Sequence, residues 1–360
     1  MRLTCLRIVA LILACLMAAP AFAGQRRGRA FPPGPREGFP PGPREGVGRP
    51  APGDDPRRGP ESTERFTRTV RLARNGTFDL SNVAGDIVIT GGGGNEVRID
   101  AVKRVRSRDE ADAAARLQAI EIDIIEVTNR VEVRTVYPRL QRNLAGAVDY
   151  TVMVPQDAAV MVKTVSGDVR VSNVRGELRA ESVSGSVTAA DVPRVSGLRS
   201  VSGDITLTGG AAEASLTAVT VSGNLLVRGF KGRNLDASSV SGELRFDNVE
   251  SERVTMKSVS GNIAYGGALA GNGRYEFNSH SGNIRLALVG DTGFDLDANT
   301  FSGDVQSAYA LTLRGGDAPP GGRLGRGRGA RARTVRGTFG DGSASLALQS
   351  FSGAIEIARR

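Results

Sequence analysis

The sequence contains few of the residues from which common active sites are built. Histidine occurs once, at His280, tryptophan is absent, and the only cysteines are Cys5 and Cys15. A histidine-based triad or a His/Cys metal site needs partner residues that this composition does not supply. We therefore expect a protein that is not an enzyme and has no catalytic residue, metal site or cofactor.

Residues 1–23 predict a secretory signal peptide. Arginines precede an apolar run over residues 8–19, and the Ala21-Phe22-Ala23 sequence provides a small-x-small cleavage site. Ala23 would be the last residue of the signal peptide and Gly24 the first residue of the mature chain. The apolar run is too short to span a bilayer. The sequence therefore predicts an exported protein, located in the periplasm, on the cell surface or outside the cell.

The position of the cysteines bears on processing. Cleavage after Ala23 would remove both Cys5 and Cys15, so the mature chain would form no disulfide. A lipoprotein, in which Cys15 carries the lipid, is an alternative that the sequence leaves open.

Residues 24–62 have the composition of a disordered linker. The octapeptide FPPGPREG occurs from Phe31 and again from Phe39, and proline, glycine and arginine dominate the segment. Too little apolar surface is present to offset the entropy lost on ordering. This segment could act as a tether or as a ligand for a proline-recognising partner.

A six-residue phrase, such as TVSGDV from Thr164 or SVSGDI from Ser200, recurs nine times between Thr164 and Ile355. A repeat of about 19 residues with alternating polar and apolar positions is typical of stacked β-coils. We predict an all-β parallel β-solenoid, right-handed by the general crossover rule. The glycines of the phrase are predicted to form the corners of the coils, where a positive φ is needed: Gly167, Gly185, Gly203, Gly223, Gly242, Gly261, Gly282, Gly303 and Gly353.

Stacking would place equivalent side chains in columns. Two columns are predicted to face the core, one on each side of the corner. The first consists of Val165, Val183, Val201, Val221, Val240, Val259, His280, Phe301 and Phe351. The second consists of Val169, Val187, Ile205, Leu225, Leu244, Ile263, Ile284, Val305 and Ile355.

The predicted domain covers residues 63–360 and has two parts. Residues 63–163 contain less regular strand patterns and one helix, for which Ser107 and Glu110 suggest a capping box. This helix is expected to cover the unpaired edge of the first coil. Regular coils follow over 164–360, interrupted by a Gly/Arg-rich insertion at 315–337 that is predicted to be disordered.

Positive charge is concentrated in the two segments predicted to be disordered. The chain carries a net charge of +9, and the linker and the insertion contain most of the excess arginine. These segments could contact an anionic surface such as acidic lipid or polysaccharide. Export argues against nucleic acid as a partner, so an envelope protein or a polysaccharide is the expected one.

Carboxylates are the only residues in the sequence that suggest catalysis or cation binding. Asp291, Asp295, Asp297 and Asp304 lie close in sequence, and Asp295 and Asp297 share a strand face. Glycoside chemistry or cation binding near Asp295 stays open. A solvated polar edge is the simpler interpretation.

The N-terminal segment GTFDLSNVAGDIVITGGGGNEVRIDAVKR, the VDYTVMVP strand and the serial SVSGDI-type phrases resemble the DUF4097 family of adhesin-like bacterial β-solenoid proteins. The resemblance covers roughly residues 65–356. It implies an exported or surface-associated, non-enzymatic protein, and the family has no catalytic residues to transfer. The linker and the insertion depart from the family pattern.

Three functions are consistent with these observations. The first is an adhesin-like structural or interaction protein of the cell envelope that binds through a solenoid face or through the basic segments. The second is a periplasmic sensor or regulator of envelope stress. The third is a polysaccharide-active β-helix enzyme that uses carboxylates.

Overall fold

The computed structural model describes residues 60–107, 109–138, 146–210, 214–313 and 333–360. These residues form an all-β structure with one helix, as the sequence predicts. The predicted signal peptide, with Ala23 and Gly24, lies outside the described residues. The linker was predicted to extend to residue 62, but its last residues, Glu61 and Ser62, belong to the first strand, β1 (Glu61–Arg71).

Each regular coil contributes two strands, one on either side of the corner glycine. The strands before the corner form one surface, called face 1: β2 (Thr77–Ala84), β8 (Ala159–Ser166), β10 (Glu177–Ser184), β12 (Arg194–Ser202), β14 (Ala214–Ser222), β16 (Lys231–Ser241), β20 (Phe294–Ser302) and β24 (Ala344–Ser352). The strands after the corner form face 2: β3 (Ile87–Gly92), β9 (Val169–Ser172), β11 (Val187–Ala190), β13 (Ile205–Thr208), β15 (Leu225–Arg228), β19 (Ile284–Val289), β21 (Val305–Ser307) and β25 (Ile355–Arg359). Two long strands, β17 (Leu244–Ser260) and β18 (Ile263–Ser281), begin on face 2 and end on face 1.

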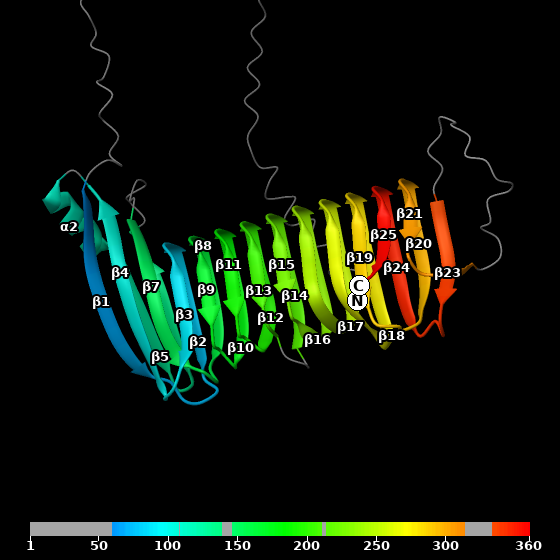
Figure 1. The fold of residues 1–360 in the computed structure, drawn as a ribbon. Coiled ribbons are helices and arrows are strands. Elements are labelled where there is room, and N and C mark those ends of the chain that lie inside the picture. Colours follow the sequence, from blue (N-terminus) through cyan, green and yellow to red (C-terminus); the bar gives the residue numbers. More distant parts are fainter. Residues whose placement is uncertain (1–59, 108, 139–145, 211–213, 314–332) are drawn as a thin grey trace, which may run out of the picture. The chain divides into compact units, whose positions relative to one another are not determined.

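Equivalent strands of neighbouring coils pair in parallel and in register (Figure 1). On face 1, Ser166 pairs with Ser184, Ser184 with Ser202, and Ser202 with Ser222. The predicted parallel β-solenoid is therefore confirmed. Its register keeps each type of side chain in one column, as stacking of identical phrases requires.

The N-terminal end of the solenoid is built from antiparallel pairs. Its strands are β4 (Glu96–Arg106), β5 (Glu121–Val127), β6 (Arg130–Val136) and β7 (Gly146–Pro155). β1 pairs with β4 and β4 with β7 in antiparallel fashion, and β5 pairs with β6 likewise. β6 and β7 then join β2 and β3 in parallel, which connects this end to the regular coils.

The one described helix, α2 (Glu110–Ala119), lies where the sequence predicted a helix, but its N-terminal cap differs. Asp109 is the N-cap, and its side chain accepts a hydrogen bond from the backbone of Ala111 at 3.1 Å. Ser107 instead donates to Asp112 at 2.7 Å. The Ser107–Glu110 capping box was therefore wrong, because the helix begins two residues later than that pattern requires.

The insertion was predicted to be disordered over 315–337, and its last part is not. Arg333–Gly337 belongs to β23 (Arg333–Phe339), which pairs antiparallel with β20 and with β22 (Thr312–Leu313). The rest of the insertion, up to residue 332, lies outside the described residues.

The core lies between the two faces. The second predicted column is buried, with exposed fractions of 0 % at Val169, Ile205 and Ile284, and only Val305 is half-buried. Truncating such a buried isoleucine to alanine costs about 2–5 kcal/mol, because the close-packed surroundings cannot fill the cavity. The first predicted column does not face the core but lies on the outer surface of face 1.

Candidate binding surface

An exposed column of apolar side chains runs along face 1 from coil to coil. We call it the stripe, and in stacking order it consists of Val83, Val165, Val183, Val201, Val221, Val240, Val259, His280, Phe351 and Phe301. All but Val83 were predicted to face the core, and that prediction was wrong. Eight of these valines and phenylalanines are 43–50 % exposed, and Val221 is half-buried.

The alternation of the strand explains why the valines point outward. In β8, Val160 and Val162 are buried, so Thr164 takes the next inward position and Val165 points away from the core. The same alternation buries the polar residue before every stripe residue, which is Asn82 before Val83 and a Ser or Thr elsewhere, for example Ser182 and Ser200. The sequence contains this signal, because an apolar residue stands two positions before each of these hydroxyls.

The stripe ends in stacked rings. His280 and Phe351 have ring centroids 4.9 Å apart at an interplanar angle of 8°, and Phe351 and Phe301 are 4.9 Å apart at 4°. His280 is thus an exposed member of the stripe and not a core residue. With ten members spaced by the strand separation, the stripe is about 43 Å long.

The corner glycines make this regular spacing possible. A Cβ on Gly203 would lie 2.3 Å from the carbonyl oxygen of Gly185 in the preceding coil, and one on Gly261 would lie 2.0 Å from that of Gly242. The predicted positive φ is present at only some corners, among them Gly167 and Gly185. Close stacking of glycine on glycine, rather than backbone conformation, is what all nine corners share.

Two ladders of side-chain hydrogen bonds connect neighbouring coils beneath the stripe, and the first is incomplete. In it, Ser200 donates to the corner carbonyl of Gly185 at 3.1 Å and Thr300 to that of Gly353 at 3.1 Å, and Thr220 and Ser350 form the equivalent bonds at 3.4 Å. The other five buried hydroxyls form no hydrogen bond: Thr164, Ser182, Ser239, Ser258 and Ser279. The residue after the corner forms the second ladder. There, the Asn224 carboxamide oxygen accepts from the backbone of Glu243 at 3.0 Å.

The second ladder also accounts for the carboxylates that recur after the corner glycines. Asp168 accepts from the backbone of Ser186 at 2.9 Å, and Asp204 accepts from that of Asn224 at 2.7 Å. These side chains cap backbone donors that an edge of the coil would otherwise leave to water. Their recurrence therefore has a structural explanation.

The acidic run near Asp295 is engaged by the C-terminal part of the chain. Asp295 accepts from the Thr338 hydroxyl at 3.1 Å, and Asp297 lies 3.4 Å from the Arg336 guanidinium. Asp291 pairs with Arg359. Within the described ranges no group of three or more His, Cys, Asp or Glu side chains could hold a metal ion.

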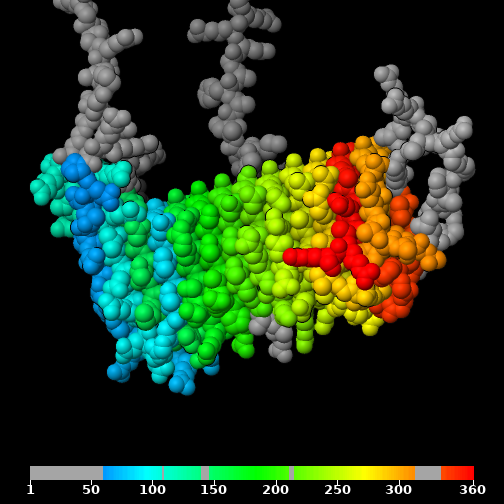
Figure 2. Space-filling model, viewed as in Figure 1, coloured from blue at the N-terminus to red at the C-terminus, as the bar shows by residue number. Residues whose placement is uncertain are grey.

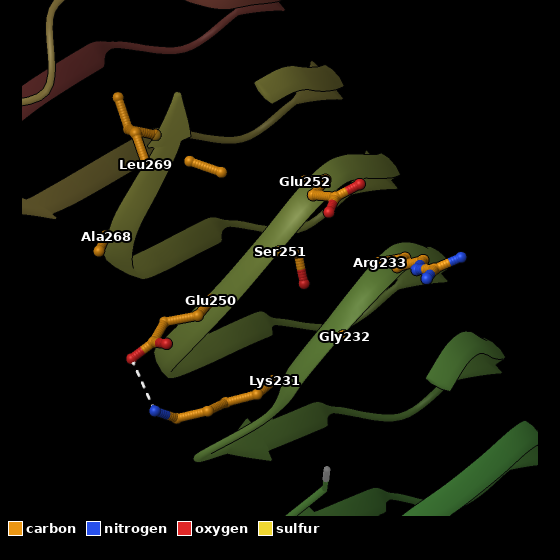
Figure 3. A pocket seen from close by; sticks show the side chains of 9 residues that line it. Lys231, Gly232, Arg233, Glu250, Ser251, Glu252, Ala268 and Leu269 are labelled. Atoms are coloured by element: carbon orange, nitrogen blue, oxygen red, sulfur yellow. Dashed lines mark ion pairs between the residues drawn. The ribbon is translucent and has the colours of Figure 1, made fainter. Parts of the chain in front are cut away.

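A shallow depression of about 480 Å³ lies where β16, β17 and β18 turn between the faces (Figure 3). Lys231 and Glu250 form an ion pair of 3.1 Å at its edge, and Leu269 lies on its apolar side. Ser251 is only 4 % exposed, and its carbonyl accepts from the Tyr275 hydroxyl at 2.6 Å. Burial raises the pKa of Tyr275, so this phenol stays protonated at neutral pH and donates the bond to Ser251.

No helix in the described part of the chain is long and apolar enough to cross a membrane.

The model of the DUF4097 family, named Toastrack, matches residues 86–317, more than half of the chain. This chain belongs to the DUF4097 (Toastrack) family. The match spans the coils from β3 to β22, and therefore includes most of the stripe.

Solved structures similar to this Toastrack chain share little sequence with it. A candidate adhesin from Bacteroides fragilis is 12 % identical with a TM-score of 0.38, covering 82 % of this chain and 97 % of its own. A candidate lipid-binding protein from Parabacteroides distasonis is 11 % identical with a TM-score of 0.40, covering 62 % and 89 %. A candidate cell adhesion protein from Clostridium sporogenes is 12 % identical with a TM-score of 0.18, covering 82 % and 100 %. No curated protein matches the chain significantly. At these values the similar structures support no argument about function.

Proposed function

We propose that this protein is an exported, non-enzymatic component of the bacterial cell envelope that binds a protein partner through the stripe. The observation that supports the proposal is a continuous exposed apolar column on an otherwise polar face. Scattered exposed apolar residues need no explanation, but contiguous ones mark interaction surfaces. Membership of the Toastrack family and the signal-peptide pattern of residues 1–23 are consistent with it.

A protein partner fits the chemistry of the stripe better than a polysaccharide. Sugars are usually bound on the exposed faces of aromatic rings. Here the rings of His280, Phe351 and Phe301 stack on one another, so the face of the middle ring is covered on both sides. The valines offer only apolar surface, which an apolar protein surface would cover.

The fold provides the rigidity that such a surface needs. We infer a right-handed solenoid of about 19 residues per coil, with α2 packed near β1 and β4 as its N-terminal cap. The basic linker and insertion would then add long-range attraction to an anionic envelope surface. We propose the periplasm or the cell surface as the location, with cleavage after Ala23.

Valine-to-threonine substitutions test the proposal because they keep shape and strand propensity while removing apolar surface. Val183→Thr, Val201→Thr and Val240→Thr together should weaken binding of the purified protein to envelope fractions by about ten-fold or more. The matched control carries Val127→Thr, Val136→Thr and Val289→Thr, which are exposed valines outside the stripe. Thermal unfolding should be similar for both variants.

Equal binding by the two triple variants would contradict the proposal. A variant lacking residues 315–332 separates the stripe from the basic insertion. If that deletion abolishes binding and the stripe substitutions do not, the insertion is the contact.

A further inference from the structure

The last coil of the chain does not lie at the end of the stack. β24 and β25 follow β20 and β21 in sequence, but they lie between β18–β19 and β20–β21. Figures 1 and 2 show this as a red segment between yellow and orange ones. In the described residues, β20 forms no ladder with β18. Stacking in chain order, which the sequence predicts, therefore does not hold here.

The inserted coil forms the same ladders on both of its sides. Towards β18, the Gly282 amide donates to the Ser352 carbonyl at 3.1 Å. Towards β20, the Gly353 amide donates to the Ser302 carbonyl at 3.2 Å. These bonds involve the backbone of the repeated phrase, so any other coil with this phrase could form them.

The coil Phe294–Ser307 meets the requirements of the same slot. Its phrase, TFSGDV, has the serine, the corner glycine and the apolar residue of the others. Ser302 lies 21 residues after Ser281, the same spacing that separates Ser281 from Ser260. Direct stacking on β18 would thus need no unusual connection.

Only a few contacts select the observed order. Arg285 pairs with Glu356 at 2.8 Å, and Asp291 pairs with Arg359. These four side chains are 47–74 % exposed, and exposed pairs contribute about 0–1 kcal/mol each. β23 adds a seven-residue antiparallel ladder on the outer edge of β20, where Phe339 packs against Phe294 and Tyr309. The ion pairs are weak, and the β23 contacts lie at the outer edge of the stack rather than in the slot itself.

We propose that the segment Arg333–Arg360 leaves its slot and that the coil Phe294–Ser307 takes its place against β18 and β19. The end of the solenoid thereby exchanges between two stacking orders. In the second order Phe351 no longer lies between His280 and Phe301, so the exchange changes the aromatic end of the stripe. This consequence for binding rests on the proposed function, whereas the exchange itself does not.

Cysteine pairs at outward positions of face 2 report the stacking order. Arg285 pairs in register with Glu356, and Glu356 with Gln306, so Arg285 and Gln306 are two strand spacings apart, about 10 Å. A disulfide needs Cα atoms within about 7 Å. The Arg285→Cys, Gln306→Cys pair can therefore close only in the second order.

The experiment uses the full-length chain with Cys5→Ser and Cys15→Ser and compares three pairs under mild oxidation. Ala264→Cys with Arg285→Cys, neighbours in either order, should close fully within the chain. Arg285→Cys with Glu356→Cys should close in the observed order. The disulfide between Arg285→Cys and Gln306→Cys should form more slowly than the other two, over hours. Adding Arg359→Ala and Thr338→Ala, which remove contacts of the segment Arg333–Arg360, should make this disulfide form several-fold faster.

Absence of the intramolecular 285–306 disulfide, while the other two pairs close, would overturn the proposal. So would a 285–306 disulfide that forms only between chains. A chain ending at Leu313 provides the positive control, since nothing then competes for the slot and the 285–306 pair should close at once. Binding to envelope fractions is not measured, so failure of the stripe proposal would not affect this result.

Discussion

At the scale of single residues, the corner glycines are fixed by the distance between coils. Each lies directly on a glycine of the neighbouring coil, and any side chain would enter the backbone of that neighbour. Relief would require the whole coil to move, which would break the ladders on both sides. The glycines are therefore the positions at which a single methyl group should have the largest effect.

Gly203→Ala is expected to lower the free energy of unfolding by about 3 kcal/mol or more, because its Cβ would lie 2.3 Å from the Gly185 oxygen. Gly93→Ala is the matched control, since a Cβ there meets no atom within 4 Å. It should change stability by less than about 0.5 kcal/mol. Denaturant unfolding of both variants measures the difference, and similar midpoints would show that the corners tolerate a side chain.

A buried tyrosine should make stability depend on alkaline pH. The Tyr150 hydroxyl lies 2.7 Å from that of Thr135, and burial raises the pKa of Tyr150 to about 12. Because this pKa exceeds the unfolded value of about 10, the contribution is complete below pH 10 and is lost as pH rises towards 12. The loss is on the order of 2 kcal/mol.

Tyr150→Phe removes this residue's contribution to the dependence, whereas Tyr137 and Tyr275, whose pKa values burial also raises, keep theirs in both proteins. Unfolding free energies of the wild type and the variant, compared between pH 8 and pH 12, should converge or cross as pH rises. A constant difference over this range would mean that the phenol does not titrate as its burial requires.

At the scale of elements, alternation within a strand decides which side chains reach the surface. The stripe faces outward because the residues one, three and five positions earlier are buried, not because of its own chemistry. The cap of helix α2 likewise depends on its surroundings, since the side chains of Ser107 and Asp109 could each have capped it. Ser107 instead donates to Asp112, and this bond lowers the pKa of the Asp112 carboxyl.

Asp109→Ala should destabilise α2 by about 1 kcal/mol, because the Ala111 amide loses its acceptor. Glu110→Ala is the control, and it should have little effect since the capping box is not formed. Hydrogen exchange at the amides of α2 would show faster exchange in the first variant only. Equal exchange in both would place the cap elsewhere.

At the scale of the whole molecule, the solenoid depends on neighbouring coils only. Each coil contacts the next through the same columns, so stability is close to a sum over coils and interfaces. The register of Ser184 with Ser202 means that one coil could be removed without disturbing the columns on either side.

Deletion of Gly185–Ser202, which joins Ser184 to Gly203, is expected to give a folded solenoid one coil shorter. Its melting temperature should fall by no more than about 10 °C, since one repeat and one interface are lost. Deletion of Gly185–Pro193, half a coil, is the control and should prevent folding, because it places the face 1 strand β12 where a face 2 strand is required. Circular dichroism and thermal unfolding of the two variants would decide, and failure of the whole-coil deletion to fold would contradict additivity.

The sequence by itself determined the repeat, the corner phrase and the parallel solenoid. Periodicity is enough for these, because every coil must present the same columns to its neighbours. It also placed the second inward column correctly, since Val169 and Ile205 stand two residues after the corner glycine and alternate with polar residues.

Only the tertiary structure decided the cap of α2 and the order of the last coils. The direction of the first column could have been predicted from the apolar residues before it, such as Val160 and Val162, which place Thr164 inward and Val165 outward. The position of β24 between β18 and β20 could not be predicted, because the repeated phrases of these coils are nearly the same. When repeats are interchangeable, their sequence specifies that coils stack but not which coil stacks on which.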